Sequence, residues 1–373
     1  MAVGKTSNKK LVIITVILAV IVVVTAGVFT VIYFNNMAKQ KALAETESQV
    51  KPDTSFLNVY GEKPKTPDGT LEYNNTIMCG NGKLFRTSDV DYKFNKRKEE
   101  QNFQDILYLL KKSNQISNVL YVQRPSKYKP DTDVLPYDYT IEFNKKYDYW
   151  FNHMQENGIP AMDLRVDNQK HNVFYYGDHH WTIESSFYGA KAILERLSQE
   201  YKGKYTVDSQ LYKRSNFADL TKDGFLGEEA ERSDKLFMGS EKITYLIPKY
   251  DTDFVMREYD DRELVRETEG KFQEALINMD RLNEWEGSKY NASLYAANNE
   301  VRIINNKSKN DKKVLLIANS LGRSMTMYIS LGFRETRYID PQKDRFNESL
   351  SAYVHEYNPD FVVVMYNQNI KKK

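Results

Sequence analysis

The feature that most constrains this chain is an uncharged apolar run over residues 11–34, LVIITVILAVIVVVTAGVFTVIYF. The run exceeds the roughly 20 residues that a helix needs to cross a bilayer. Lys5, Lys9 and Lys10 precede it, which by the positive-inside tendency places the N-terminus in the cytoplasm. A signal peptide cleaved at Ala42–Ala44 fits less well, because the run is longer than a usual signal core. We therefore expect an uncleaved, single-pass signal-anchor in the cell membrane, with the C-terminal domain extracytoplasmic.

The composition excludes several classes of protein. The 373 residues carry 53 basic and 51 acidic side chains and a net charge of +2, so no strong field favours nucleic acid. Cys79 is the single cysteine, which excludes an internal disulfide and a cysteine-rich zinc site. It also excludes the protein acyltransferases whose similar-looking string ends in cysteine, because DHHW ends in Trp181.

The remaining chain divides by composition into three parts. Residues 1–10 form a short basic tail, and residues 35–70 are polar and punctuated by proline and glycine, as expected of a stalk and linker. From residue 71 to residue 373 the pattern is globular. We expect this last part to be one extracytoplasmic domain.

Short apolar runs alternate with helical patterns within residues 71–373. The runs at 118–122, 312–318 and 360–366 are bounded by polar residues, as expected of parallel strands covered on both faces. This alternation predicts an α/β fold with a mainly parallel sheet and helices on both sides. Residues 203–300 are charged and irregular, and we expect insertions there rather than a second core.

The stretch YYGDHHWTIES, residues 175–185, holds two of the five histidines of the chain. Thr182 is a good N-cap, and apolar residues follow it at helical spacing. In an extended segment before that helix, Asp178 and His180 would face one way and His179 the other. A carboxylate that reaches an imidazole fixes its tautomer, as a general base requires.

Two other interpretations of this stretch remain open at this point. The adjacent histidines are compatible with ordinary surface polarity, with Asp178 as a turn residue. A metal site made by His171, Asp178 and one of the histidine pair is also compatible with the pattern. Taken alone, the stretch does not choose between them.

The second stretch is VLLIANSLGRSM, in which a buried strand delivers Asn319 and Ser320 to its carboxyl end and a helix follows at once. Ligands of open α/β sheets bind at that edge. A serine there exposes its hydroxyl near helix-terminal N–H groups, which could hold an oxyanion, and Gly322 allows close backbone approach. The alternative is that Ser320 is only the N-cap of the helix.

Ser320, His180 and Asp178 together supply a nucleophile, a base and an orienting carboxylate. We therefore name them as candidate catalytic residues. Gly322 and Arg323, at the start of the same helix, are candidates for oxyanion or substrate binding. Tyr366 and Asn367, which with Gln368 end the strand DFVVVMY, are candidates for the same role, unless they are solvated residues at the end of an edge strand. These candidates are Ser320, His180, Asp178, Gly322, Arg323, Tyr366 and Asn367.

The stretch YYGDHHWT resembles the sequence signature of bacterial DHHW proteins, which are similar to the SGNH-hydrolase-like periplasmic alginate O-acetyltransferases. GNGKLF (80–85), IPAMDLR (159–165), DGFLGEEAERSDKLF (223–237) and the Ser320 stretch follow the family order. The resemblance covers residues 71–373 and implies an SGNH-hydrolase-like three-layer sandwich. It also implies that Asp178 orients, His180 is the base and Ser320 is the nucleophile.

The resemblance further implies a membrane-anchored enzyme that transfers an acyl group, most simply acetyl, to or from a cell-surface polysaccharide without a cofactor. In relatives a membrane-bound O-acyltransferase supplies the acyl group. The family has aspartate and phenylalanine where this chain has Asn319 and Leu321. That departure motivates the alternative of a non-catalytic surface-glycan binding or assembly protein with the same fold.

Overall fold

The computed structural model describes residues 71–129, 133, 135, 140–260, 262–297, 300–341, 349–368 and 370. The expected tail, signal-anchor and stalk lie outside these residues and stay predictions. Among the described residues, no helix combines the length and hydropathy that a membrane crossing requires.

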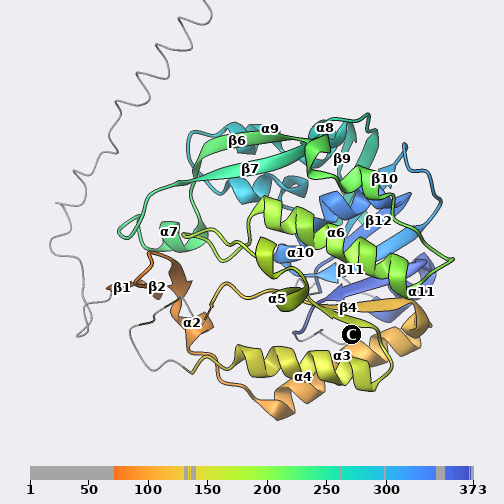
Figure 1. The fold of residues 1–373 in the computed structure, drawn as a ribbon, viewed down its shortest axis with the longest axis horizontal. Coiled ribbons are helices and arrows are strands. Elements are labelled where there is room, and N and C mark those ends of the chain that lie inside the picture. The colour runs from red at the N-terminus through yellow and green to blue at the C-terminus, as the bar shows by residue number, and fades with distance from the viewer. Residues whose placement is uncertain are drawn as a thin grey trace, which may run out of the picture. The chain divides into compact units, whose positions relative to one another are not determined.

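The centre of the fold is an eight-stranded sheet in the order β5-β4-β13-β11-β12-β10-β8-β9 (Figure 1). The first five strands in this order are parallel, and the last three continue the sheet in antiparallel pairings. This arrangement confirms the mostly parallel α/β sheet that the sequence predicts. The strands are β5 (Ala161–Asp163), β4 (Val119–Gln123), β13 (Phe361–Met365), β11 (Lys313–Ala318), β12 (Glu335–Ile339), β10 (Glu300–Asn305), β8 (Phe254–Asp260) and β9 (Glu263–Gly270).

Helices cover both faces of the parallel strands and produce the expected three layers. Side chains of a strand point alternately to its two faces, and in β11 the buried Val314 and Leu316 join one core while Leu315 and Ile317 join another. The first core includes α6 (Ile183–Glu200) and α10 (Ser320–Ile329). The second includes α3 (Lys96–Lys112), α4 (Phe143–Glu156) and α11 (Leu350–Tyr357). Continuous apolar strand sequences are therefore explained by burial on both faces.

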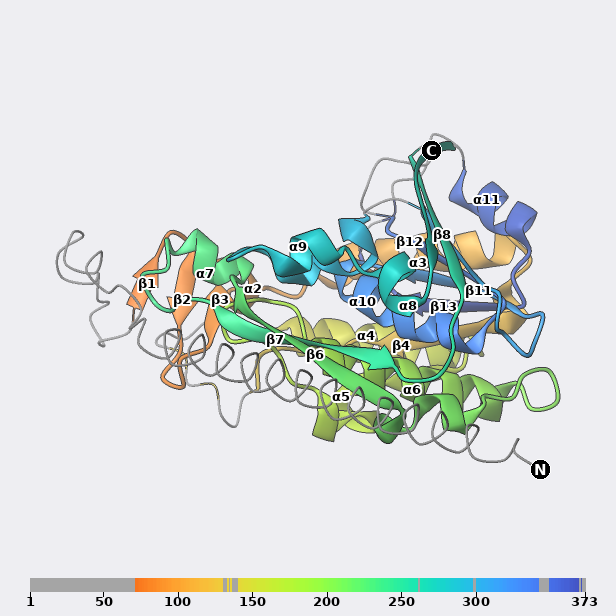
Figure 2. The same cartoon turned by 90° about the horizontal axis from the view of Figure 1, so that it is seen from above.

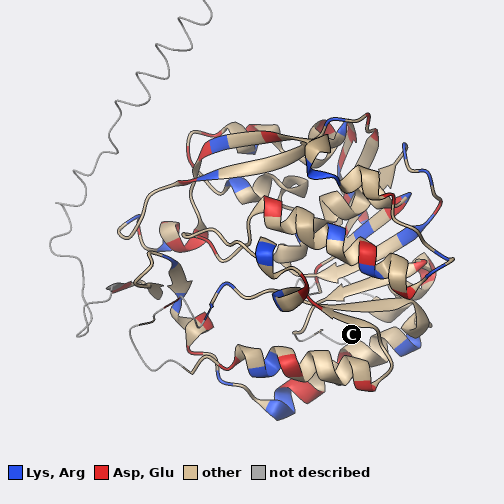
Figure 3. Ribbon diagram, in the orientation of Figure 1, with Lys and Arg blue, Asp and Glu red and all other residues tan. Residues whose placement is uncertain are grey.

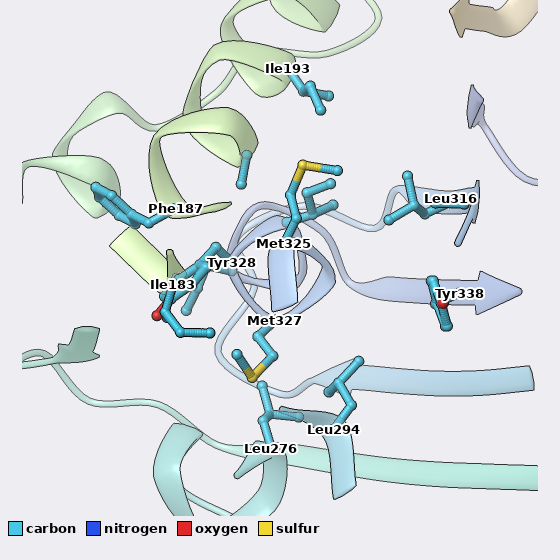
Figure 4. Close-up of a cluster of buried hydrophobic side chains, with 14 of the residues drawn as sticks. Ile183, Phe187, Ile193, Leu276, Leu294, Leu316, Met325, Met327, Tyr328 and Tyr338 are labelled. Carbon is cyan, nitrogen blue, oxygen red and sulfur yellow. The ribbon is translucent and has the colours of Figure 1, made fainter. Parts of the chain in front are cut away.

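Two helices beside the sheet carry the segments that matter for the site. Helix α6 begins after Thr182, whose hydroxyl accepts the N–H of Ser185 at 3.1 Å, so the predicted N-cap is confirmed. Helix α10 lies within the first core, where Met325, Met327 and Tyr328 pack among side chains of α6 and of the chain after β9 (Figure 4). Because residues 321–329 of α10 are all buried, the helix and its first residue, Ser320, are held in a fixed position.

The expectation of mere insertions at 203–300 is wrong in part. β8 and β9 extend the main sheet, and alternate residues of β8 such as Phe254 and Met256 are fully buried in the first core. The hairpin β6 (Phe217–Phe225) and β7 (Glu241–Pro248) lies against α6 (Figure 2). These strands bury one face only, so charged residues alternate with apolar ones and mask the strand pattern.

Smaller elements complete the fold. They are a three-stranded sheet and several short helices. Basic and acidic residues are interspersed along the ribbon (Figure 3). The smaller elements are β1 (Leu71–Tyr73), β2 (Thr76–Met78), β3 (Leu84–Arg86), α2 (Thr87–Val90), α5 (Leu164–Asp167), α7 (Glu228–Arg232), α8 (Phe272–Leu276), α9 (Met279–Asn283), η2 (Ile116–Asn118), η3 (Gln169–His171), η4 (Ser209–Tyr212), η5 (Arg214–Asn216), η6 (Lys289–Ala292), η7 (Leu294–Ala296) and η8 (Ser330–Gly332).

Candidate active site

Asp178, His180 and Ser320 form a continuous hydrogen-bonded chain. His180 Nδ1 lies 2.5 Å from Asp178 Oδ1, and His180 Nε2 lies 2.9 Å from Ser320 Oγ. The first two residues precede α6, and Ser320 is the first residue of α10, at the carboxyl end of β11. The fold thus brings together three side chains that are distant in sequence, in the arrangement of nucleophile, base and orienting carboxylate.

The charge state of the pair suits a general base. Asp178 is 2% exposed and His180 is 7% exposed. Burial lowers the pKa of His180 to about 4, assisted by His179 and opposed by Asp178. Burial acts to raise the pKa of Asp178, but the charge and hydrogen bond of His180 outweigh it and hold that pKa well below its usual range. At neutral pH, an ionised carboxylate therefore faces a neutral imidazole.

Backbone groups hold the carboxylate of Asp178 in place. Its Oδ1 also accepts the backbone N–H of His180 at 2.8 Å, and its Oδ2 accepts the N–H of Glu228, at the start of α7, at 2.8 Å. Gly227 makes the close approach possible, because a Cβ there would lie 2.2 Å from the carbonyl oxygen of Gly177. Gly227 and Glu228, within the family-like stretch 223–237, thus orient the carboxylate of Asp178.

The expectation that His179 faces away from His180 is wrong. Residues 176–180 form a bend rather than a strand, closed by a bridge between Phe174 and Trp181. The two imidazole rings consequently lie 3.9 Å apart between centroids. His179 Nδ1 is 3.0 Å from Arg86 Nη2 and 3.3 Å from Glu229 Oε1.

Lys127 is a buried residue of the site that sequence reasoning missed. Its ammonium donates to three backbone carbonyl oxygens, those of Leu84 at 2.6 Å, Tyr176 at 2.9 Å and Asp178 at 2.8 Å. Burial lowers its pKa, against the attraction of nearby carboxylates. One side chain therefore connects the first residue of β3 to two residues of the bend, Tyr176 and Asp178. A single lysine that follows a strand belongs to no recognisable sequence pattern, so the role of Lys127 could not be predicted from the sequence.

Asn319, and not Ser320, is the N-cap of α10. Its Oδ1 accepts the N–H of Leu321 at 3.2 Å, and its carbonyl accepts the N–H of Gly322 at 2.8 Å. The interpretation of Ser320 as a mere cap is therefore wrong, and the side chain of Ser320 faces His180. The same contacts engage two of the helix-terminal N–H groups that we expected to face an oxyanion.

None of the other four candidates lines the pocket that opens beside Ser320. Gly322 packs tightly on Ala318, where a Cβ would lie 2.4 Å from that side chain, and Arg323 is 3% exposed and donates to Asn291 at 2.6 Å. Tyr366 is buried in the second core, on the side of α3, α4 and α11, and Asn367 is buried as well. The interpretation as an edge-strand end is also wrong, because β13 lies between β4 and β11.

A pocket of about 340 Å³ opens beside Ser320, in the size range of small-ligand sites. Gln368, which follows β13, contributes to its wall, as do Asn319 and His179. The wall also includes basic and aromatic side chains: Arg86, Arg124, Lys127, Lys146, Phe85, Tyr92, Tyr128, Phe143, Tyr147 and Phe174. Aromatic faces suit sugar rings, and the basic groups suit polar or anionic substituents.

The metal interpretation fits this geometry less well. Asp178, His179 and His180 each offer a donor atom within 4.8 Å of the others. Both ring nitrogens of His180, however, already lie at hydrogen-bond distance from Asp178 and Ser320. For His180 to bind a metal, one of its ring nitrogens would have to lose its contact with Asp178 or Ser320.

The comparisons with known proteins agree with this architecture. The family described as "SGNH hydrolase-like domain, acetyltransferase AlgX" matches residues 81–268, half of the chain. The chain belongs to this family. The match includes the Asp178 and His180 segment and α7, and it ends before Ser320. The acetyltransferase named in the description of this family supports an acyltransferase or esterase activity.

Solved structures share the fold at low sequence identity. PatB1 of Bacillus cereus, solved with a sulfonyl adduct, has a TM-score of 0.59 and 14% identity over 77% of this chain and 94% of its own. A DHHW family protein of Eubacterium siraeum has a TM-score of 0.56 and 16% identity over 81% of this chain and 93% of its own. The resemblance to DHHW proteins and to SGNH-like acetyltransferases is thus confirmed. None of the curated proteins compared with the sequence matches it.

Proposed function

We propose that this chain is a serine-dependent O-acetyltransferase or acetylesterase that acts on a cell-surface polysaccharide. The observation that carries the proposal is the buried hydrogen-bonded chain from Asp178 through His180 to Ser320, which ends at a pocket. Membership of an acetyltransferase family supports acetyl as the transferred group. We further propose that residues 11–34 anchor the enzyme in the cell membrane, with the catalytic domain on the outer side.

The first half-reaction would form an acyl-enzyme. Ser320 Oγ attacks the carbonyl carbon of the acyl donor, and its proton passes to His180 Nε2 at the 2.9 Å contact. The imidazolium that forms is stabilised by Asp178 through the contact of 2.5 Å. The tetrahedral intermediate then expels the leaving group, which takes the proton from Nε2. A membrane-bound O-acyltransferase is the donor partner that we propose.

The second half-reaction would use the same histidine in reverse. A sugar hydroxyl in the pocket attacks the acyl carbon and gives its proton to His180 Nε2. The new ester leaves, and Ser320 Oγ recovers the proton. Water in place of the sugar would give an esterase, so transfer requires that the acceptor fill the pocket and exclude water.

Intact mass spectrometry of the full-length chain with a chromogenic acetyl ester tests the proposal. We expect an adduct of about 42 Da, the mass of an acetyl group that replaces a proton, on the wild type and no adduct on Ser320→Ala. His180→Ala should lose turnover, whereas Ser215→Ala, which removes an exposed serine remote from the triad in sequence, should behave as wild type. Turnover retained by Ser320→Ala would refute serine dependence. A folded wild type with neither adduct nor turnover, even with membranes that contain the donor enzyme, would favour the glycan-binding alternative.

A further inference from the structure

Aromatic rings cover both faces of the imidazole of His180. His179 lies on one side with centroids 3.9 Å apart and a tilt of 38°, and Tyr290 is stacked on the ring at 4.0 Å and 22°. The two ring nitrogens meanwhile point to Asp178 and Ser320. The edges of the ring are thus used for proton transfer and its faces for packing.

Tyr290 is itself held rigidly, and by the helix that carries the nucleophile. Its side chain is 1% exposed, and its hydroxyl lies 2.6 Å from Ser324 Oγ. Ser324 is fully buried and lies about one turn after Ser320 on α10. Burial raises the pKa of Tyr290, so the phenol stays neutral. The same residue therefore contacts the base through its ring and the helix of Ser320 through its hydroxyl.

The imidazole needs such support because its terminal torsion has no sharp staggered minimum. A rotation about that torsion would separate Nε2 from Ser320 while leaving the backbone unchanged. Proton transfer requires a short contact between these atoms. A misplacement of about 1 Å can reduce a rate by about 10²-fold.

We propose that Tyr290 is a positioning residue of the catalytic base. Its ring holds the imidazole of His180 in the plane that joins Asp178 to Ser320, and its hydroxyl fixes that plane to α10 through Ser324. The inference rests on the proposed function, because it assumes that His180 moves protons. It extends the site to a residue of η6, a segment that the sequence assigned to insertions.

The test is steady-state kinetics of the full-length chain with a chromogenic acetyl ester. Tyr290→Leu removes the ring face and should lower kcat about 10- to 100-fold. KM should change little, because Tyr290 is not among the residues that line the pocket. Tyr290→Phe keeps the ring and should restore most of kcat. Ser324→Ala should match Tyr290→Phe, and the double variant should be no worse than either, because both remove one hydroxyl contact.

Tyr205→Leu is the matched control for a merely structural effect. Tyr205 is 4% exposed and stacks on Phe333 at 4.7 Å between centroids, and neither residue lines the pocket beside Ser320. Tyr205→Leu should lower the unfolding temperature without lowering kcat of the folded fraction. Equal losses of kcat in Tyr205→Leu and Tyr290→Leu, or a Tyr290→Leu kcat within twofold of wild type, would overturn the inference. If Tyr290→Leu does not fold, Tyr290→Phe and Ser324→Ala decide, and additive losses in the double variant would also overturn it.

Ser320→Ala separates this inference from the proposed function. If Ser320→Ala keeps its turnover, the proposed function fails and the positioning role fails with it. If Ser320→Ala is inactive and Tyr290→Leu turns over as wild type, only the positioning role fails.

Discussion

The enzyme should stay active at pH values well below those at which an enzyme with an ordinary histidine base loses its activity. The protonated imidazole cannot accept the proton of Ser320, so the rate follows the neutral fraction of His180. Burial lowers the pKa of His180 to about 4, from an ordinary value of 6.5. At pH 5 the neutral fraction is then about 0.9, against about 0.03 for an unperturbed histidine. The predicted difference in rate at pH 5 is therefore about 30-fold.

The assay is the rate of acyl-enzyme formation on the full-length chain between pH 3.5 and 8, with circular dichroism at each pH to verify folding. We expect a plateau above pH 5 and a decline with unit slope below about pH 4. Removal of His179, the second cause of the shift, should move the decline to higher pH, and His179→Gln tests this. A midpoint near pH 6.5 in a folded wild type would refute the argument that burial determines the charge of His180.

Three further predictions follow from the contacts around the triad. Asp178→Asn should lower kcat by about 10²- to 10⁴-fold while the chain stays folded, because a neutral amide cannot stabilise the imidazolium and its NH2 group would meet the N–H of Glu228; stopped-flow kinetics tests this. Asn319→Ala should lower the free energy of unfolding by about 1 kcal/mol, whereas Asn319→Asp should leave it nearly unchanged, since both asparagine and aspartate cap helices. Denaturant titration measures both values, and equal free energies of unfolding in the two variants would contradict the prediction. Chelation by EDTA should leave turnover unchanged, because both ring nitrogens of His180 already have partners; a loss that zinc restores would favour a metal site.

The centre of the parallel sheet could be predicted from the sequence because β4, β13 and β11 are buried on both faces. The apolar runs at 118–122, 312–318 and 360–366 contain little besides core residues, and no solvent-facing position interrupts them. β8 and β10 were missed for the opposite reason. Their half-exposed positions include the charged residues Arg257 and Arg302, and nothing local shows that the apolar positions between them face the main core.

The triad could be predicted because its residues stand at the ends of recognisable elements, and a known family has the same residues in the same order. The residues that hold the triad in place could not be predicted from the sequence. Lys127 and Tyr290 act through contacts with segments far away in the sequence, and a lysine or tyrosine is common in any chain. Asn319 is instructive, since its difference from the family suggested altered activity, whereas its side chain caps α10.

The position of β13 has a consequence for the synthesis of the protein. This strand is the last one among the described residues, yet it pairs with β4 on one side and β11 on the other. Until it emerges from the ribosome, β4 and β11 present unpaired edges toward each other, and exposed edges promote aggregation. We therefore expect premature stop codons before Phe361 to give insoluble protein rather than shortened active enzyme, even though every residue of the triad has by then been made.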